Sequence, residues 1–234
     1  MDVTRSIKQL VKVALGREFF IRPDKAYPKE RFGSRYGGWD LVTRDIGPDS
    51  VIYSFGIGED ASFDVGVIER FGVTVHGFDP TPKSVAWVQS QGMPPQFVMH
   101  VLGIADFDGE ISFNPPENPD HVSHTMLERP STQAKAITVP VERLSTIMTR
   151  LGHAHIDVLK MDIEGAEYDV VNDLRRSGIR PGQILIEFHH RFPGVGVDKS
   201  KDAIATIRAM GYHLYSVSAT NEEFCFIRVP QQMH

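Results

Sequence analysis

Two apolar segments of the chain end in side chains that could do chemistry. Asp162 directly follows the run Ile156–Met161, and Glu187 and His189 lie at the end of the run Gln183–Phe188. Residues two apart on a strand face the same side, so the three groups converge if the two strands are neighbours. They could bind a divalent cation such as Mg²⁺ through their oxygens, with His189 as a further ligand. Alternatively, His189 could act as a general base near neutral pH.

A second candidate site is the glycine-containing stretch Val51–Asp60. A short apolar run ends in Gly56-Ile57-Gly58, and apolar residues then recur at helical spacing. This strand–turn–helix context is typical of sites for nucleotide-like ligands, because the glycines let the backbone approach the ligand and the helix start offers free N–H groups. The acidic residues Glu59 and Asp60 follow the glycines directly.

Two further strand ends could contact the same ligand. Asp79 ends the apolar segment Val73–Phe78 roughly 20 residues after the glycines, which is the spacing of a carboxylate that binds ribose hydroxyls. Ile104 and Ala105 could hold an adenine between them, and Asp106 could accept a hydrogen bond from its amino group. Helix caps and ordinary turns are the alternative roles for these residues.

The elements that must position these groups alternate between strands and helices, which predicts a doubly wound, mostly parallel α/β sheet. The expected strands are Val51–Tyr53, Val73–Phe78, Phe97–Leu102, Ile156–Met161, Gln183–Phe188, Tyr212–Val217 and Phe224–Val229, with a short extra strand at Glu110–Phe113. Helices are expected around residues 63–71, 82–91, 144–151, 166–174 and 203–210. Ligands of such sheets bind at the carboxyl ends of the strands, where all the groups above lie. The last two strands should form an antiparallel hairpin.

Three other segments are less regular or stand apart. Residues 17–50 look irregular, and Trp39 within them could form a wall over the ligand. The polar segment Asn114–Ala136, which includes His124, is the candidate substrate loop. A one-sided helix near residues 7–15 is expected to cap the domain or to form a homodimer contact. We therefore expect an extension at 1–35 and a catalytic domain at 36–234.

Composition narrows the possible partners and compartment. The net charge of −5 argues against nucleic acid, because proteins that bind phosphate backbones usually carry a basic excess. The one cysteine, Cys225, permits no internal disulfide, which favours a cytoplasmic location. No apolar run approaches the roughly 18 residues that a membrane span needs, so no membrane span is expected.

Several motifs taken together resemble one known family. The blocks YSFGIGED, HGFDPTP, LGIADFDG, VLKMDIEGAE and ILIEFHH occur in this order between about Tyr36 and Arg228. They are similar to the FkbM family of S-adenosylmethionine-dependent methyltransferases, and the closing hairpin resembles the end of the class I methyltransferase fold, which is Rossmann-like. The resemblance implies methylation of a hydroxyl group on a small molecule, sugar, glycan, lipid or secondary metabolite.

The resemblance also implies roles for individual residues. Asp162 and His189 would be catalytic. The cofactor would contact Gly56, Ile57, Gly58, Glu59, Asp60, Asp79, Ile104, Ala105, Asp106 and Asp162. The acceptor would contact Trp39, His124, Glu187 and His189. A cation, if one is used, would be held by Asp162, Glu187 and His189.

One departure and two alternatives remain open at this stage. Methyltransferases often carry a carboxylate two residues before the first glycine, to hold the methionine amine, whereas this chain has Ser54 there. Glu59, Asp60 or Asp162 could hold the amine instead. The glycine spacing also fits an NAD(P)-dependent oxidoreductase, although no Tyr-x-x-x-Lys pair follows the fourth strand. An inactive homologue that only binds the cofactor is the other alternative.

Overall fold

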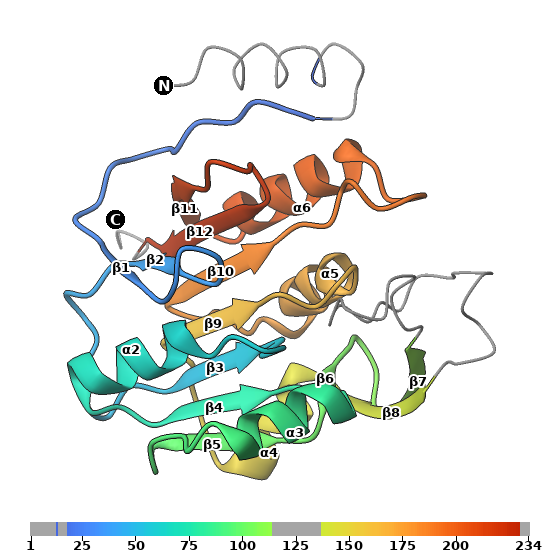
Figure 1. The fold of residues 1–234 in the computed structure, drawn as a ribbon. Coiled ribbons are helices and arrows are strands. Elements are labelled where there is room, and N and C mark those ends of the chain that lie inside the picture. The colour runs from blue at the N-terminus through green and yellow to red at the C-terminus, as the bar shows by residue number, and fades with distance from the viewer. Residues whose placement is uncertain (1–12, 14–17, 114–136, 230–234) are drawn as a thin grey trace.

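The computed structural model of this 234-residue chain describes residue 13 and residues 18–113 and 137–229. Its centre is a seven-stranded sheet in which neighbouring strands are parallel except at β12 (Figure 1). In spatial order the strands are β11 (Tyr212–Val217), β12 (Glu223–Arg228), β10 (Gln183–Glu187), β9 (Val158–Met161), β3 (Ile52–Phe55), β4 (Val75–Phe78) and β5 (Phe97–His100). The predicted mostly parallel α/β sheet with a closing antiparallel hairpin is confirmed.

Helices cover both faces of this sheet. They are α2 (Ser62–Phe71), α3 (Pro82–Ser90), α4 (Leu144–Leu151), α5 (Glu167–Ser177) and α6 (Val197–Ala209). One hydrophobic core joins α4, α5 and α6 to one face, and a second joins α2 and α3 to the other. Since strand residues alternate between the faces, β3 sends Tyr53 and Phe55 to the first core and Ile52 to the second.

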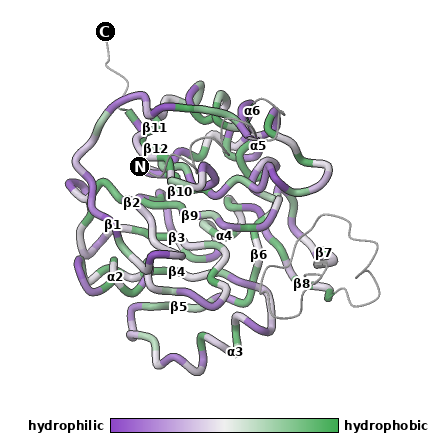
Figure 2. The backbone as a smooth tube through the Cα atoms, turned by 45° about the horizontal axis from the view of Figure 1, so that its top comes forward, coloured by the Kyte–Doolittle hydropathy of each residue, from purple (hydrophilic) through white to green (hydrophobic). Residues whose placement is uncertain are grey.

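The helices form where apolar residues recur at helical spacing. In α4 the buried residues Leu144, Ile147 and Met148 follow the i, i+3, i+4 pattern, so one side of the helix packs on the sheet and the other faces solvent. Along the helices hydrophobic and hydrophilic residues alternate accordingly (Figure 2). Each fully buried Leu or Ile side chain stabilises the fold by about 1.5–3 kcal/mol.

Three local expectations need correction. The segment before β3 is not wholly irregular, because β1 (Glu30–Phe32) pairs with β2 (Trp39–Leu41) in a hairpin across the expected domain boundary at residue 35. The strand expected at Phe97–Leu102 is β5, and it ends at His100, where the Leu102 N–H donates to the His100 carbonyl. Past it, β6 (Gly103–Ile104) joins β7 (Gly109–Phe113) and the unpredicted β8 (Ile137–Glu142) in a separate sheet.

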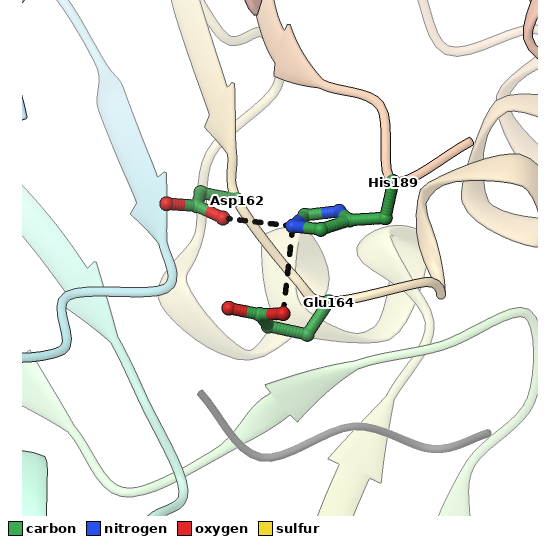
Figure 3. A group of neighbouring side chains, drawn as sticks. All are labelled: Asp162, Glu164 and His189. Carbon is green, nitrogen blue, oxygen red and sulfur yellow. Dashed lines mark ion pairs between the residues drawn. The ribbon is translucent and has the colours of Figure 1, made fainter. Parts of the chain in front are cut away.

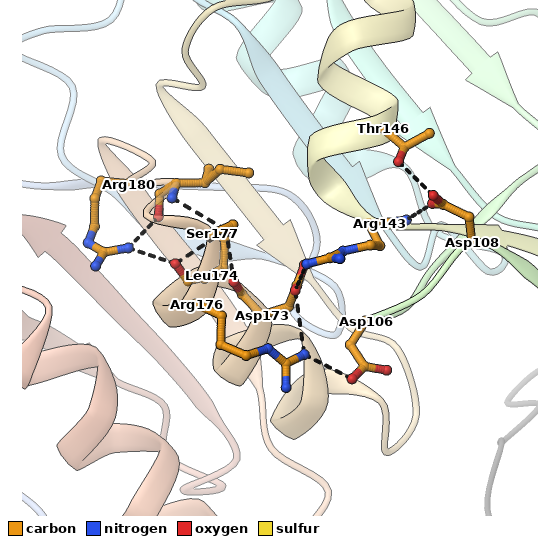
Figure 4. A network of polar contacts seen from close by, with 10 residues as sticks. Asp106, Asp108, Arg143, Thr146, Asp173, Leu174, Arg176, Ser177 and Arg180 are labelled. Carbon is orange, nitrogen blue, oxygen red and sulfur yellow. Dashed lines mark hydrogen bonds and ion pairs between the residues drawn. The ribbon is translucent and has the colours of Figure 1, made fainter.

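The small sheet is fastened to α4 and α5 by a polar network (Figure 4). Asp108 accepts hydrogen bonds from the Arg143 backbone at 2.7 Å and from the Thr146 hydroxyl at 2.9 Å. Arg143 in turn pairs with Asp173, a residue of α5 that is almost fully buried. This network attaches the β6–β7 turn to the start of α4 and to α5.

A cluster of three histidines packs against Tyr53 beneath α4. His76 lies 3.0 Å from His100 between ring nitrogens, and Tyr53 hydrogen-bonds His153 at 2.7 Å. Burial, together with the neighbouring His100 and His153, lowers the pKa of His76 to about 4. Its ordinary pKa in an unfolded chain is about 6.5.

We expect the protein to lose stability through His76 as the pH falls. The folded pKa lies below the unfolded one, so between pH 6.5 and 4 the unfolded chain binds the extra proton and its free energy falls relative to that of the folded state. The contribution of His76 is fully present above pH 6.5, and about 1–3 kcal/mol of it is lost by pH 4. Urea unfolding of the wild type and of His76→Phe at pH 7 and pH 5 measures it. An equal pH dependence in both proteins would contradict this role.

The described residues contain no helix that is long and apolar enough to span a bilayer. The expected N-terminal helix near residues 7–15 and the candidate substrate loop 114–136 lie outside the described residues, apart from residue 13, which is helical.

Candidate functional site

The glycine turn after β3 packs directly on the end of β9. Gly56 N–H donates to the Phe78 carbonyl of β4 at 3.0 Å, and Asp162 N–H donates to the Phe55 carbonyl at 3.0 Å. A side chain at position 56 would place its Cβ 1.7 Å from the Asp162 carbonyl oxygen, and the backbone there has φ +79°. Only glycine fits this position, and its close approach places the turn beside Asp162.

A buried lysine supports this turn from below. Strand alternation turns Lys160 of β9 toward the α2 face, where its Nζ donates to the Gly56 carbonyl at 3.0 Å. The Trp39 ring lies 5.9 Å from the same Nζ. Trp39 is only 4% exposed, so in this structure it forms the floor of the turn and not a wall open to an acceptor.

Ser54 lies on the same side of the sheet as Lys160. Its side chain faces α2, where the fully buried carboxyl group of Asp64 lies near both Ser54 and Lys160. Burial raises the pKa of Asp64, whereas the positive charge of Lys160 opposes that rise. Ser54 thus has a carboxylate, that of Asp64, as its neighbour on α2, but this carboxylate is buried and cannot contact a ligand.

Asp79 lies where a ribose contact was expected, but it also braces the turn. One of its carboxylate oxygens accepts from Gly58 N–H at 3.0 Å. The other accepts from the backbone and the hydroxyl of Thr81, at 2.9 and 2.6 Å, at the start of α3. Asp79 therefore lies beside the glycines, as predicted, and also stabilises the start of α3.

The two carboxylates after the glycines have protein partners. Glu59 forms an ion pair with Lys83 at 3.3 Å. Asp60 accepts from the Ser34 hydroxyl at 2.6 Å and from Ser62 N–H at 2.8 Å. Burial would raise the pKa of Asp60, but these hydrogen bonds outweigh it and hold the pKa below its usual value. Asp60 thereby joins the β1–β2 turn to the start of α2.

The predicted adenine contacts are only partly arranged for that role. Ile104 and Ala105 both lie at the predicted strand end and are each 3% exposed. Asp106 pairs with Arg176 of α5 at 3.0 Å, as part of the network in Figure 4. Its carboxylate is therefore engaged by a cation that the sequence does not place next to it.

At the ends of β9 and β10 the structure brings together Asp162, Glu164 and His189 (Figure 3). His189 Nε2 lies 3.7 Å from Asp162 Oδ1 and 3.5 Å from Glu164 Oε2. Its other ring nitrogen, Nδ1, lies 3.2 Å from Glu167 Oε1, which also accepts from the His189 backbone N–H at 2.9 Å. The histidine side chain is 7% exposed, so these contacts form in a largely dry setting.

The surrounding carboxylates change the expected role of His189. Burial opposes its protonation, but the hydrogen bond and charge of Glu167, with Glu164 and Asp162, raise its pKa to about 10. Burial and the charge of Asp162 raise the pKa of Glu187 well above its usual range. Both shifts favour the protonated forms of His189 and Glu187 at neutral pH. The expectation that His189 is a general base near neutral pH is not supported by this arrangement, because a base must first be neutral.

The protonation state of His189 is open to direct measurement. We expect its ring C–H resonances to stay at the charged position from pH 6 to 8 and to move only near pH 10, because three carboxylates hold the proton. The spectrum of His189→Gln assigns the signals. A titration midpoint between pH 6 and 7 would contradict the ion-paired state.

The same cluster is the candidate cation site of the described residues. One ligand atom from each of Asp162, Glu164 and His189 lies within 4.8 Å of the other two. Glu164 occupies the place that Glu187 was expected to take. It has φ +54°, an uncommon conformation for a residue other than glycine, and this conformation directs its carboxylate toward His189.

The sequence predicts the position of Asp162 and His189, but it does not predict that Glu164 and Glu167 contact His189. Carboxylates at the start of a helix are ordinarily caps, and no spacing rule predicts that Glu164 and Glu167 meet a histidine 22 or more residues away. The Glu164-Gly165 pair, which favours a tight turn, was the feature that could have indicated the direction of the Glu164 side chain. His124 and the rest of the 114–136 loop lie outside the described residues.

The glycine turn and the cluster of Asp162, Glu164 and Glu167 around His189 (the acidic cluster) lie at the carboxyl ends of adjacent parallel strands. β12 lies antiparallel between β10 and β11. Together they define a Rossmann-like α/β protein with the architecture expected for class I methyltransferases. A sequence profile described as the Methyltransferase FkbM domain matches residues 52–214. The chain belongs to the FkbM methyltransferase family.

Similar proteins are found among both sequences and structures. The probable methyltransferase-like protein 24 of Rattus norvegicus and that of Homo sapiens are each 30% identical over 156 residues, or 65% of this chain. The chain spans 36% of the length of these relatives. A crystal structure of Methyltransferase FkbM from Methylobacillus flagellatus KT matches with a TM-score of 0.49 and 15% identity, over 79% of this chain and 45% of that one.

Proposed function

We propose that the chain is an S-adenosylmethionine-dependent O-methyltransferase whose acceptor is a small molecule or glycan with a free hydroxyl group. The observation that carries the proposal is the position of Asp162. Its backbone lies against the glycine turn, and its carboxylate faces the acidic cluster at the same edge of the sheet. One residue therefore adjoins both the expected cofactor site, through its backbone, and the expected acceptor site, through its side chain.

The residues fit this cofactor better than they fit a dinucleotide. Glu59 and Asp60 follow the glycines directly, and although Lys83 offsets the charge of Glu59, the negative charge of Asp60 would oppose a pyrophosphate bound there. The methionine end of S-adenosylmethionine carries an ammonium and a sulfonium, which suit the surplus of carboxylates near Asp162. This charge pattern disfavours the NAD(P)-dependent alternative.

The chain's own groups then have distinct tasks. The cofactor supplies an electrophilic methyl group, and the protein must hold the acceptor oxygen in line with it at about 3–3.5 Å. Asp162 orients the acceptor hydroxyl and accepts its proton. The His189 cation fixes the directions of the Asp162 and Glu164 carboxylates. Glu187 in its protonated form donates a hydrogen bond to the acceptor.

A labelled cofactor tests the reaction. Extracts of cells that lack the enzyme are incubated with the protein and methyl-labelled S-adenosylmethionine, and mass spectrometry locates the label. We expect products heavier by one methyl group, with the label on an oxygen. Label found only on nitrogen, or no labelled product, would contradict the proposal.

A divalent cation at Asp162, Glu164 and His189 is the second candidate arrangement, favoured by the closeness of their ligand atoms. Two carboxylates and an imidazole suit Mg²⁺ or Mn²⁺, with His189 binding through Nε2 in its neutral form. This arrangement predicts that exhaustive chelation lowers activity and that Mg²⁺ restores it. Unchanged activity after chelation would exclude it and leave the His189 cation as the organising charge.

A further inference from the structure

Tyr36 at the tip of the β1–β2 hairpin is the most exposed large apolar side chain of the described residues, with 90% of its surface accessible. A single exposed aromatic residue is ordinary on a protein surface and means little by itself. The position of this one is unusual, because the turn that carries it is fastened at both sides to the candidate site.

On one side the turn is anchored to the start of α2. Ser34 donates from its hydroxyl to Asp60 at 2.6 Å, and the same oxygen accepts from the backbone N–H of Tyr36 at 3.0 Å and of Gly37 at 2.8 Å. Ser34 N–H also donates to the Ser62 hydroxyl at 2.6 Å. These bonds hold the backbone of Tyr36 beside the residues that follow the glycine turn.

On the other side the turn leads into the floor of the site. Trp39, three residues after Tyr36, lies over Lys160, and Lys160 holds the Gly56 carbonyl. A Cβ at position 37 would lie 2.7 Å from the Asp60 carboxylate, so the turn packs closely against the Asp60 side chain. Tyr36 is therefore carried by a tightly packed turn that is bonded to Asp60 and Ser62, the residues that follow the glycine turn.

The surroundings of Tyr36 are negatively charged. Loss of hydration near the turn, and then the charges of Asp162, Glu187 and Glu164, raise the pKa of its hydroxyl. An aromatic face with carboxylates beside it is the chemistry that recognises an organic cation, since the ring face and the carboxylates both carry negative potential.

We propose that Tyr36 is a cofactor-binding residue whose ring covers the positively charged methionine end of S-adenosylmethionine, opposite the carboxylates of the acidic cluster. The inference rests on the proposed function, because it takes S-adenosylmethionine as the ligand. It assigns Tyr36, and not Glu59 or Asp60, to the cationic end that Ser54 leaves without a carboxylate. The 33–38 turn then acts as a fixed wall of the cofactor site.

Calorimetry with three ligands tests this role on the full chain. S-adenosylmethionine carries a sulfonium, an ammonium and a carboxylate at its methionine end. S-adenosylhomocysteine keeps the ammonium and carboxylate but has a neutral sulfur, and 5′-methylthioadenosine has the adenosine and neutral sulfur without the amino-acid group. We expect Tyr36→Leu to weaken S-adenosylmethionine by at least about fivefold, the size of an ordinary cation–π contact, and to leave 5′-methylthioadenosine within about twofold. Tyr36→Phe keeps the ring and should bind like the wild type. Phe20→Leu, at another exposed aromatic residue, is the matched control.

Two results would overturn the inference while leaving the proposed function intact. Unchanged affinity of Tyr36→Leu for S-adenosylmethionine would place the ring on the acceptor side. Equal weakening of 5′-methylthioadenosine would place it on the adenosine. If the wild type binds none of the three ligands, the proposed function itself fails. Thermal unfolding of each variant shows that the fold is retained.

Discussion

Asp162→Asn is expected to lower the methyl-transfer rate by about 10²–10⁴-fold, the usual contribution of a positioned acid or base. Asparagine keeps the size of the side chain and the backbone contact with the glycine turn, but it cannot accept the proton of the acceptor hydroxyl. The binding of S-adenosylhomocysteine should change far less than the rate. Single-turnover kinetics with labelled cofactor, together with calorimetry, separate the two effects.

Asp198→Asn supplies the control for this substitution. Asp198 is a highly exposed residue near the start of α6 that pairs only with the neighbouring Lys201 among the described residues, so its loss of charge should leave the rate within about twofold. A rate in Asp162→Asn close to that of the wild type would refute the proton-accepting role of Asp162. If cofactor binding were lost to the same extent as the rate, the main role of Asp162 would be to bind the cofactor.

The second large effect is expected at the glycine turn. Gly56→Ala would force a Cβ to within 1.7 Å of the Asp162 carbonyl oxygen, in a backbone conformation with φ +79°. The ends of β3 and β9 would have to separate, so we expect a loss of about 2–5 kcal/mol in the free energy of unfolding, together with a loss of cofactor binding. Urea denaturation measures the first effect and calorimetry the second.

Gly72→Ala isolates the backbone part of this cost. Gly72 ends α2 with a similar φ of +69°, but a Cβ there meets nothing within 4 Å. We expect it to cost only about 1 kcal/mol and to spare cofactor binding. Equal destabilisation by the two substitutions would show that the contact between Gly56 and Asp162 does not determine the geometry of the site.

The framework of this protein could be predicted because its signals are local. Periodic apolar residues define α4, and apolar runs followed by glycine or aspartate define β3, β4 and β9, so the sheet edge that carries Gly56 and Asp162 follows from the sequence. The closing hairpin followed from two β-rich segments with a short connection.

The roles of several side chains depend on partners far away in the chain. Asp106 meets Arg176 across 70 residues, and no spacing rule predicts that ion pair. A histidine is ordinarily expected to act as a base near neutral pH, but the three carboxylates around His189 raise its pKa to about 10. The two aromatic residues of one turn differ for a similar reason: Trp39 packs on Lys160, whereas Tyr36 remains exposed. Their different burial depends on how the β1–β2 hairpin docks on the sheet.

The central claim is that the glycine turn holds S-adenosylmethionine and not a dinucleotide. Isothermal titration calorimetry of the full chain with S-adenosylhomocysteine and, separately, with NAD tests this claim most directly. The proposed function predicts saturable binding of S-adenosylhomocysteine, which Gly56→Ala abolishes, and no binding of NAD. Binding of NAD without binding of S-adenosylhomocysteine would contradict it.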